Sequence, residues 1–265
     1  MRTSVVVVPC YNERARLSRR LIEELATGPR VLLVDDGSTD DTATMLRALA
    51  AEIDGVECLI QPVNAGKAEA VRAGMQLAID NGAQLVGYAD ADFATGPTEI
   101  KRLCDELLRS KLDVVLGSRV RRMGAIIDRS PIRHVAGRVF ATMASVTLGL
   151  PVYDTQCGAK WFRATPRLVR ALEEPFTTRW AFDVELLGRL LQEDGSEPLR
   201  ILELPLVRWQ DVGGSKLSVV GMLRVFGEGG LLMVRSFQLR SRRRWDPGTV
   251  TIASASAESV DSPSP

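Results

Sequence analysis

The fold of this protein is indicated by residues 4–37, which read SVVVVPCYNERARLSRRLIEELATGPRVLLVDDG. Residues 4–8 form a short apolar run rich in β-branched side chains, and Pro9 ends it. Such a run is typical of a buried parallel strand. Apolar residues then recur at helical spacing, which gives one face the side chains of Leu17, Leu21, Ile22 and Leu25. Residues 31–34 are a second apolar run, so the stretch predicts a strand, a helix and another strand.

The same alternation continues over the first half of the chain. Further strands are expected at residues 56–60, 84–89 and 112–116. Helices are expected from Asp40 or Asp41 to residue 53, at residues 66–81, and from Pro97 to residue 108, where a first-turn proline is favourable. This alternation predicts an α/β fold with a doubly wound, mostly parallel sheet, right-handed crossovers and helices on both faces.

The second half of the chain is less regular. Helices are expected at residues 131–150 and 183–191, and a strand is expected at residues 200–209. The chain has 265 residues, of which 45% are hydrophobic, so we expect one large domain over residues 1–240. Residues 246–265 are rich in Ser, Ala and Pro, and we expect a disordered tail there.

Polar side chains follow four of the predicted strands, at the point where each strand ends. They lie at residues 11–13, 35–36, 64–67 and 90–92. In open α/β sheets, ligands bind beyond the carboxyl ends of the strands. We therefore expect the four clusters to converge on one site.

Asp90-Ala91-Asp92 is the candidate metal site. Two carboxylates one residue apart at a strand end can share one hard cation, and Mg²⁺ and Mn²⁺ favour oxygen ligands. A metal that bridges a diphosphate neutralises the charge on a leaving nucleoside diphosphate. Acidic pairs also occur in solvated turns that cap the next helix, and for the isolated motif that alternative stays open.

Two other strand ends carry candidate binding residues. Asp36 is either part of a tight turn or an acceptor for a base N–H or a ribose hydroxyl group. Lys67 follows a glycine at a helix start, where it could pair with phosphate beside the helix N-terminus. The surrounding sequence lacks the further glycine and the Ser or Thr of a P-loop.

Eight segments of the chain resemble, in the same order, those of family 2 glycosyltransferases. They are PCYNE (9–13), VDDGSTD (34–40), NAGK (64–67), DADFAT (90–95), GSR (117–119), DTQCG (154–158), FDVE (182–185) and GSK (214–216). More narrowly, the chain resembles the polyprenyl-phosphate (dolichyl-phosphate) glucosyl- and mannosyltransferases. The resemblance implies a nucleotide-sugar-binding fold of the GT-A type and a metal-dependent hexosyltransferase whose catalytic domain occupies residues 1–240.

The resemblance also implies roles for single residues. The nucleoside would be held by residues of the first three segments: Pro9, Tyr11, Asn12, Glu13, Asp36 and Lys67. Asp90 would face the ribose or the metal, Ala91 would lie beside the donor, and Asp92 would bind Mg²⁺ or Mn²⁺. Ser215 and Lys216 would lie on a loop that closes over the diphosphate.

The acceptor decides which catalytic groups are needed. A sugar hydroxyl group needs a general base, whereas a phosphate monoester is mostly dianionic near neutral pH and needs cations to position it. Arginine forks suit that task, so we assign the acceptor phosphate to Arg119 together with Arg133 or Arg138. The alternative is that these arginines only form the solvated basic face of a helix. Asp183 either acts as a base or only orients the acceptor and the arginines, and phosphate chemistry favours the second role.

A lipid-linked acceptor also requires a surface that faces a membrane. Near residues 131–150, a stripe beside the arginines is formed by Val139, Phe140, Met143, Val146, Thr147 and Leu150. A basic amphipathic helix suits an anionic membrane surface, although ordinary core packing explains the stripe equally well. Residues 219–239 are a second interfacial candidate. We find no signal-peptide pattern, so we expect a cytoplasmic protein bound peripherally to the cytoplasmic face of a membrane.

These observations favour one function over two others. We expect inverting transfer of a hexose, from UDP-glucose or from GDP-mannose as the second choice, to a polyprenyl phosphate. The alternatives are a family 2 enzyme with a soluble sugar or metabolite acceptor, and a nucleotide-sugar-binding protein without turnover. The 34 basic and 33 acidic residues nearly balance, so nucleic acid is not expected as a partner.

Overall fold

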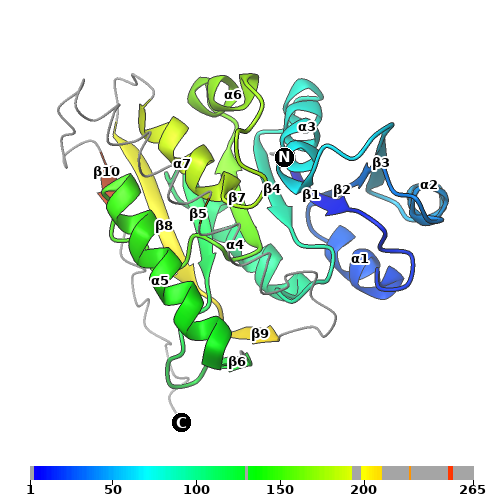
Figure 1. Ribbon diagram of the computed structural model, residues 1–265. Coiled ribbons are helices and arrows are strands. Elements are labelled where there is room, and N and C mark those ends of the chain that lie inside the picture. Colours follow the sequence, from blue (N-terminus) through cyan, green and yellow to red (C-terminus); the bar gives the residue numbers. More distant parts are fainter. Residues whose placement is uncertain (1–2, 129–130, 193–197, 211–226, 228–249, 253–265) are drawn as a thin grey trace, which may run out of the picture.

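The computed structural model describes residues 3–128, 131–192, 198–210, 227 and 250–252, with the backbone alone at 131–136 and 250–252. Strands and helices alternate along the first half of the chain (Figure 1). The strands are β1 (Ser4–Cys10), β2 (Arg30–Asp36), β3 (Val56–Gln61), β4 (Leu85–Ala89), β5 (Val114–Ser118), β6 (Ile126–Asp128), β7 (Ala159–Arg163), β8 (Leu199–Pro205), β9 (Arg208–Gln210) and β10 (Val250–Ile252). The helices are α1 (Arg19–Ala26), α2 (Thr42–Glu52), α3 (Lys67–Asp80), α4 (Pro97–Arg109), α5 (Pro131–Leu148), α6 (Pro166–Glu173) and α7 (Phe182–Gln192).

The main sheet is mixed and mostly parallel. Its strand order is β10-β8-β5-β7-β4-β1-β2-β3, and β7 runs antiparallel to both neighbours, β4 and β5. The other pairs in this sheet are parallel, and β6 and β9 form a separate parallel pair. The predicted α/β fold with a mostly parallel sheet is therefore confirmed.

Helices cover both faces of this sheet, as the alternation predicts (Figure 1). On one face, α3, α5, α6 and α7 pack through residues such as Val71, Phe140 and Leu187 in one buried cluster. On the other face, α1, α2 and α4 contribute to a second cluster, which includes Ile22 and Ile100. Side chains of a strand point alternately to the two faces, so the consecutive valines of β1 are divided between the clusters.

The predicted element bounds in the first half agree with the structure to within a few residues. One difference is β1, which continues through Pro9 to Cys10, with Pro9 opposite Val34 of β2. In the second half, the strand expected at 200–209 is two strands, β8 and β9, which belong to different sheets. Residues 250–252, inside the segment expected to be disordered, pair with β8 as β10.

The strand β7 determines where the site forms. Because β7 runs against β4, its first residue, Ala159, lies opposite Ala89, the last residue of β4. The segment that precedes β7 therefore arrives at the same sheet edge as Asp90. In the part of the chain that is described, no helix is long and apolar enough to span a membrane.

Candidate active site

Asp90 is held at the end of β4 by the segment that precedes β7. Its backbone N–H donates to the carbonyl oxygen of Gly158 at 3.0 Å. A Cβ atom at position 158 would collide with the Asp90 carboxylate, so only glycine allows this approach. On its other side, Asp90 Oδ1 lies 2.5 Å from Lys67 Nζ at the start of α3. Residues from two distant segments thus lie around the Asp90 carboxylate, and the approach of Lys67 is the one that convergence of the strand ends predicts.

Asp92 lies in the tight turn that follows Asp90. Its Oδ1 accepts a hydrogen bond from the backbone N–H of Ala94 at 3.0 Å, and Phe93 has a positive φ of 49°. Burial raises the pKa of Asp92, and the neighbouring charge of Asp90 raises it further. A bound cation would relieve the repulsion between these two carboxylates.

The donor set at this turn fits a hard divalent cation. The described residues contain no group of three or more His, Cys, Asp or Glu side chains that could hold a metal ion. Mg²⁺ does not need such a cage, since it is usually bound by one or two carboxylates together with substrate phosphates and water. Asp90 and Asp92 can supply that number of protein ligands, and a nucleoside diphosphate can supply the rest.

Lys67 is surrounded by negative charge. Burial lowers the pKa of Lys67, but the carboxylates of Asp90 and Asp183 outweigh this and raise it, so the ammonium group stays charged. Its Nζ also lies 5.8 Å from the centroid of the Phe182 ring. Lys67 therefore lies against Asp90, one of the predicted metal ligands, and its expected contact with phosphate stays a prediction.

Asp36 shapes the loop before α3. Its carboxylate accepts hydrogen bonds from the backbone N–H groups of Ala65 at 2.8 Å and Gly66 at 2.9 Å, and from Asn64 Nδ2 at 3.0 Å. The residue is 2% exposed, and burial raises its pKa although the two backbone donors act in the opposite direction. Its observed contacts are with this loop, and its expected contact with the base stays a prediction.

The segment after β1 forms the rim of the site. Asn12 Oδ1 accepts from the backbone N–H of Thr39 at 2.8 Å, which ties this rim to the end of β2. Glu13 is buried and forms an ion pair with Arg16 at 2.5 Å. Tyr11 is more accessible, with 37% of its surface exposed. Tyr11 is thus the residue of this segment that is best placed to meet a ligand.

Asp183, at the start of α7, is buried among hydrogen-bond donors. Its Oδ1 accepts from the hydroxyl group of Tyr88 and lies 2.8 Å from Lys160 Nζ, and its Oδ2 lies 3.4 Å from Gln156 Nε2. Burial raises the pKa of Asp183 to about 7 and lowers the pKa of Lys160 to about 8. The two groups are partners in the interior, one from α7 and one from β7.

Lys160 was not among the residues selected from the sequence. It is 1% exposed and its Nζ also donates to the carbonyl oxygen of Cys157 at 2.5 Å. A signal was available, because a lysine within the otherwise largely apolar run AKWF needs an acidic partner when it is buried. The sequence alone did not reveal which carboxylate that partner would be.

The two described arginines of the predicted acceptor site have partners within the protein. Arg119 forms a bidentate pair with Asp154, with Nε–Oδ2 and Nη2–Oδ1 distances of 2.6 and 2.8 Å. Its guanidinium carbon also lies 5.3 Å from the centroid of the Trp209 ring. Arg138 stacks on Tyr153 at 3.8 Å from the ring centroid and donates to its carbonyl oxygen. The arginines are therefore oriented by the segment before β7.

Three predicted site residues lie where the structure says nothing of their side chains. Arg133 belongs to the first turns of α5, for which the backbone alone is described, and Ser215 and Lys216 are outside the described residues.

Glu185, two residues after Asp183, has a different role from its neighbour. Its carboxylate accepts from the backbone N–H groups of Thr177 and Thr178, both at 3.0 Å, so it orders the loop before α7.

That loop carries a second cation that the sequence did not single out. Arg179 is exposed, and its Nη2 donates to Asn64 Oδ1 at 2.9 Å. Its charge acts to lower the pKa of Asp36, against the effect of burial. Arg179 thus joins the loop before α7 to the loop before α3, next to the expected nucleotide.

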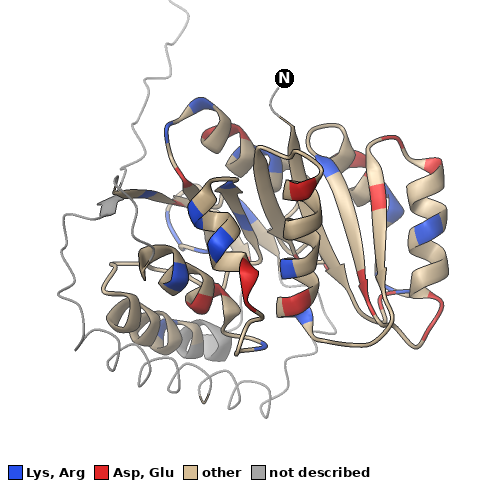
Figure 2. Ribbon diagram, turned by 90° about the horizontal axis from the view of Figure 1, so that it is seen from above, with Lys and Arg blue, Asp and Glu red and all other residues tan. Residues whose placement is uncertain are grey.

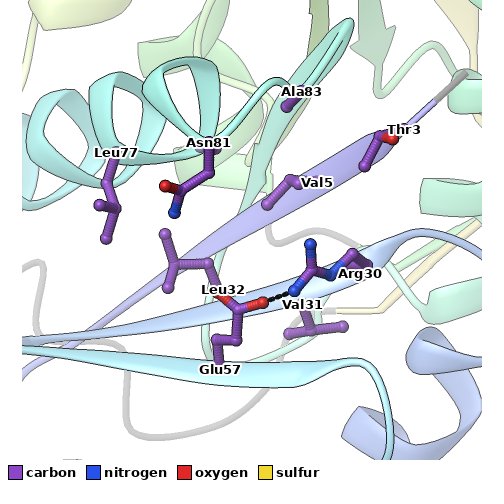
Figure 3. A pocket seen from close by; sticks show the side chains of 10 residues that line it. Thr3, Val5, Arg30, Val31, Leu32, Glu57, Leu77, Asn81 and Ala83 are labelled. Carbon is purple, nitrogen blue, oxygen red and sulfur yellow. Dashed lines mark ion pairs between the residues drawn. The ribbon is translucent and has the colours of Figure 1, made fainter.

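A separate small pocket lies at the opposite edge of the sheet, beside the amino ends of β1 and β2 (Figure 3). It is lined by Thr3, Val5, Leu32, Leu77 and Asn81 among others, and an ion pair between Arg30 and Glu57 crosses its edge. None of the residues expected to bind the donor or the acceptor lines it. The pocket is therefore separate from the predicted donor and acceptor sites.

The sequence of this chain matches a known family. The family model described as "Glycosyl transferase family 2" matches residues 5–167, which include β1 from its second residue and all of β2 to β7. The chain belongs to this family. As a family 2 glycosyltransferase, it is an enzyme that uses a nucleotide sugar, as the eight ordered segments predict.

Curated relatives narrow the resemblance within family 2. Over 237 residues, the chain is 32% identical to dolichyl-phosphate beta-glucosyltransferase ALG5C of Trichomonas vaginalis, with 83% of this chain and 67% of that protein covered. It is 26% identical over 219 residues to polyprenol monophosphomannose synthase of Mycolicibacterium smegmatis, with 81% of each covered. This family 2 glycosyltransferase thus spans about two thirds of the length of the first of these relatives.

Solved structures share the fold of this glycosyltransferase. S. aureus TarS 1-349 in complex with UDP-GlcNAc has a TM-score of 0.54 and 14% identity, with 91% of this chain and 71% of that chain covered. The mannosyltransferase PcManGT of Pyrobaculum calidifontis, in complex with GDP-Man and Mn²⁺, has a TM-score of 0.51 and 16% identity, with 92% and 76% covered. At these identities the likeness concerns the fold alone, and it confirms the GT-A architecture.

Proposed function

We propose that this enzyme transfers a hexose, with inversion, from a nucleotide sugar to a polyprenyl phosphate. The single observation that carries the proposal is the environment of Asp183. Its two oxygens face donors from Tyr88, Lys160 and Gln156, so they are poorly placed to take a proton from an acceptor hydroxyl group. An acceptor that is already anionic removes the need for that proton transfer.

The pKa of Asp183 has to be weighed against this geometry. Burial raises the pKa to about 7, which by itself would suit a general base. A base also needs an oxygen within hydrogen-bonding reach of the acceptor, and Asp183 is 6% exposed. We therefore assign Asp183 the task of holding Lys160 and Tyr88 in place beneath the reacting groups.

The proposed reaction is an in-line displacement. An oxygen of the acceptor phosphate forms a bond to the anomeric carbon while the bond from that carbon to the nucleoside diphosphate breaks. The diphosphate leaves with the bonding electrons, so the configuration at the anomeric carbon inverts and no proton has to be removed. Asp90 and Asp92 would hold Mg²⁺ or Mn²⁺, which when bound supplies charge neutralisation for the leaving diphosphate.

The acceptor phosphate is assigned to arginines at the other side of the site. The pair with Asp154 engages Nε and Nη2 of Arg119, and the guanidinium group has a further donor nitrogen, Nη1, for a phosphate oxygen. Arg133 lies in the first turn of α5 and Arg138 about two turns into it, and either would complete this phosphate site. UDP-glucose is the favoured donor, because the relative from Trichomonas vaginalis is a dolichyl-phosphate beta-glucosyltransferase, and GDP-mannose is the second choice.

Peripheral binding to the cytoplasmic face of a membrane is part of the proposal. Met123, Ile126 and Val207 are exposed near the β6–β9 pair, with Ile126 N–H bonded to the carbonyl oxygen of Val207. Arg122 and Arg208 are exposed beside them. This mixture of apolar and basic side chains suits the surface of an anionic membrane.

The helix α5 contributes less to such a surface than its sequence suggests. Of the predicted stripe, Phe140, Thr147 and Leu150 are buried in the protein, whereas Val139 and Val146 are exposed. The helix carries no charged residue from Val139 to Leu148, and Figure 2 draws uncharged residues in tan. Residues 219–239, the second interfacial candidate, lie outside the described residues apart from Gly227.

A donor and acceptor screen tests the proposed reaction. The full chain in detergent would receive UDP-glucose or GDP-mannose, Mg²⁺ or Mn²⁺, and either a polyprenyl phosphate or the matching polyprenol without phosphate. We expect transfer to the phosphate and none to the alcohol. Equal transfer to the alcohol or to a soluble sugar would contradict the acceptor assignment. The variant Asp92→Ala should lose transfer, whereas Asp105→Ala, which removes an exposed carboxylate of α4, should keep it.

Sedimentation with vesicles tests the membrane contact. We expect the enzyme to pellet with vesicles that contain anionic lipid, and Met123→Asp with Ile126→Asp to weaken this binding. The control is Val169→Asp, which places one added carboxylate on an exposed valine of α6, at 41% exposure, and its matched variant is Ile126→Asp alone. If the wild type, the double variant and the control pellet equally, the surface near the β6–β9 pair is not the contact with the membrane.

A further inference from the structure

Lys67 occupies part of the coordination space that a metal at the carboxylate pair would need. Its ammonium nitrogen is 2.5 Å from Asp90 Oδ1, a distance at which the two groups share a strong charge-assisted hydrogen bond. The side chains of Lys67 and Asp90 are 30% and 34% exposed, so the pair lies at the open side of the site. One of the two candidate metal ligands thus already has a cation as its partner.

The start of a helix is an unfavourable place for this lysine. Lys67 is the first residue of α3, where the helix dipole presents its positive end and disfavours a cation. The backbone N–H groups of Ala65 and Gly66 before it are bonded to Asp36. What stabilises the ammonium group is therefore the acidic cluster in front of it, and Asp90 is the nearest member of that cluster.

The charges around Lys67 explain why a metal ion alone would bind poorly. When all groups are ionised, the carboxylates of Asp90, Asp92 and Asp183 oppose the ammonium groups of Lys67 and Lys160, which leaves one net negative charge. A divalent cation added to this cluster would lie beside an ammonium group and make the net charge positive. Like charges a few ångströms apart repel, and the repulsion is stronger in a partly buried site.

A nucleoside diphosphate changes this balance. Its negative oxygens can bind the metal and the ammonium group at the same time, so Lys67 can leave Asp90 without losing an anionic partner. The flexible four-carbon side chain of lysine allows such an exchange of partners within the same site.

We propose that Lys67 is the internal counter-ion of the Asp90–Asp92 pair, and that it keeps free metal out of the site until the diphosphate of the donor arrives. Metal and nucleotide then bind as one complex, and Lys67 passes from Asp90 to the diphosphate. The inference rests on donor binding in the proposed function, and it does not depend on the identity of the acceptor.

Manganese binding measures this coupling without any turnover. Mn²⁺ would be titrated into the full chain, and the signal of free Mn²⁺ would be followed by electron paramagnetic resonance, without nucleotide and with saturating UDP or, in parallel, GDP. For the wild type we expect weak binding of Mn²⁺ alone and about tenfold tighter binding with the matching nucleotide, a usual size for coupling between ligands. For Lys67→Met we expect Mn²⁺ alone to bind about tenfold more tightly than to the wild type, and the gain from nucleotide to shrink.

Three controls make the result specific. Lys111→Met removes the same charge from an exposed lysine between α4 and β5, and it should bind Mn²⁺ as the wild type does. Lys67→Arg keeps the charge and should retain weak binding of Mn²⁺ alone. Asp92→Ala should lose Mn²⁺ binding with and without nucleotide. Thermal unfolding of each variant would identify any loss of fold.

Two outcomes would overturn the inference. Unchanged or weaker binding of Mn²⁺ alone by folded Lys67→Met would show that Lys67 does not compete with metal. Equal binding of Mn²⁺ by the wild type with and without both nucleotides would show that no coupling exists. Neither outcome bears on the acceptor, whereas failure to use polyprenyl phosphate would contradict the proposed function and leave this measurement intact.

Discussion

Lys160 Nζ lies 2.8 Å from Asp183 Oδ1 in the protein interior, where the two side chains are 1% and 7% exposed. One residue comes from the antiparallel strand β7 and the other from the first turn of α7. Removal of one partner of an ion pair buried this deeply strongly destabilises the folded protein, because the remaining charged group has neither water nor a counter-ion. The pair therefore contributes both to the stability of the folded protein and to the positions of the side chains at the site.

We predict that Lys160→Met destabilises the protein by about 3 kcal/mol, because it leaves Asp183 buried without its cation. Urea unfolding at pH 8 would measure the loss. The double variant Lys160→Met with Asp183→Asn should regain most of that stability, since neither charge remains. It should not regain transferase activity if the pair positions the reacting groups. A double variant as unstable as the single variant would contradict the pairing.

The stability of the enzyme should depend on the protonation of Asp183. Burial raises the pKa of its carboxyl group to about 7 from an ordinary value near 3.8, so the folded state holds this proton more tightly than the unfolded state. The contribution of this group is fully present below pH about 4 and is lost as the pH rises through about 7. Relative to Asp183→Asn, the wild type should lose free energy of unfolding across this window. A constant difference between the two proteins from pH 4.5 to 8 would contradict the raised pKa.

Two glycines that flank α3 provide a test of the contact with Arg179. Gly66 has a φ of +98°, and a Cβ atom there would lie 2.8 Å from Arg179 Nε. Gly82, after the other end of α3, has a φ of +84° and nothing within 4 Å of an added Cβ. Both alanine variants should lose stability from backbone strain, and Gly66→Ala should lose more, because a φ of 98° with a ψ of 158° is a combination that only glycine adopts readily. Only Gly66→Ala should also raise the KM for the donor, because it displaces Arg179 and the loop that Asp36 holds.

If Gly66→Ala and Gly82→Ala give the same KM for the donor, Arg179 does not contribute to nucleotide binding. Steady-state kinetics at saturating acceptor would provide this comparison. Thermal melting of both variants would measure the loss of stability, which we expect to be larger for Gly66→Ala.

The acceptor assignment predicts a selective defect in Arg119→Ala with Arg133→Ala. Transfer to polyprenyl phosphate should fall by at least about a hundredfold, since removal of charged hydrogen bonds of this kind costs about 1.5–3 kcal/mol each. Binding of the donor nucleotide, measured by calorimetry, should change little. Arg109→Ala removes an exposed arginine of α4 and should have no effect on transfer. Retained transfer in the double variant would contradict the assignment.

Much of the site follows from local sequence patterns. Apolar runs of strand length, separated by helical periodicity, predict β1 to β5 and the helices between them, because each of these elements buries a face that its own residues define. The carboxyl ends of parallel strands share one sheet edge. The placement of Asp36, Lys67, Asp90 and Asp92 near one another could therefore be predicted before any contact was known.

The partners of these residues could not be predicted in the same way. The strand β7 is short and enters between β4 and β5 in the opposite direction, so that Ala159 pairs with Ala89 and Lys160 pairs with Leu116. No local periodicity of the sequence specifies such a pairing, since it depends on which strands the rest of the sheet leaves without a neighbour. It brings Gly158 to Asp90 and Lys160 to Asp183.

The sequence by itself determined the fold class, the family and the edge of the sheet where the chemistry lies. Only the tertiary structure decided which charged groups neutralise one another there: Lys67 with Asp90, Lys160 with Asp183 and Arg119 with Asp154. The physical reason is the difference between distance along the sequence and distance in space. Hydrophobic periodicity is a pattern among residues that are close in the sequence. A buried charge, in contrast, is stabilised by whichever opposite charge the packed chain brings within a few ångströms.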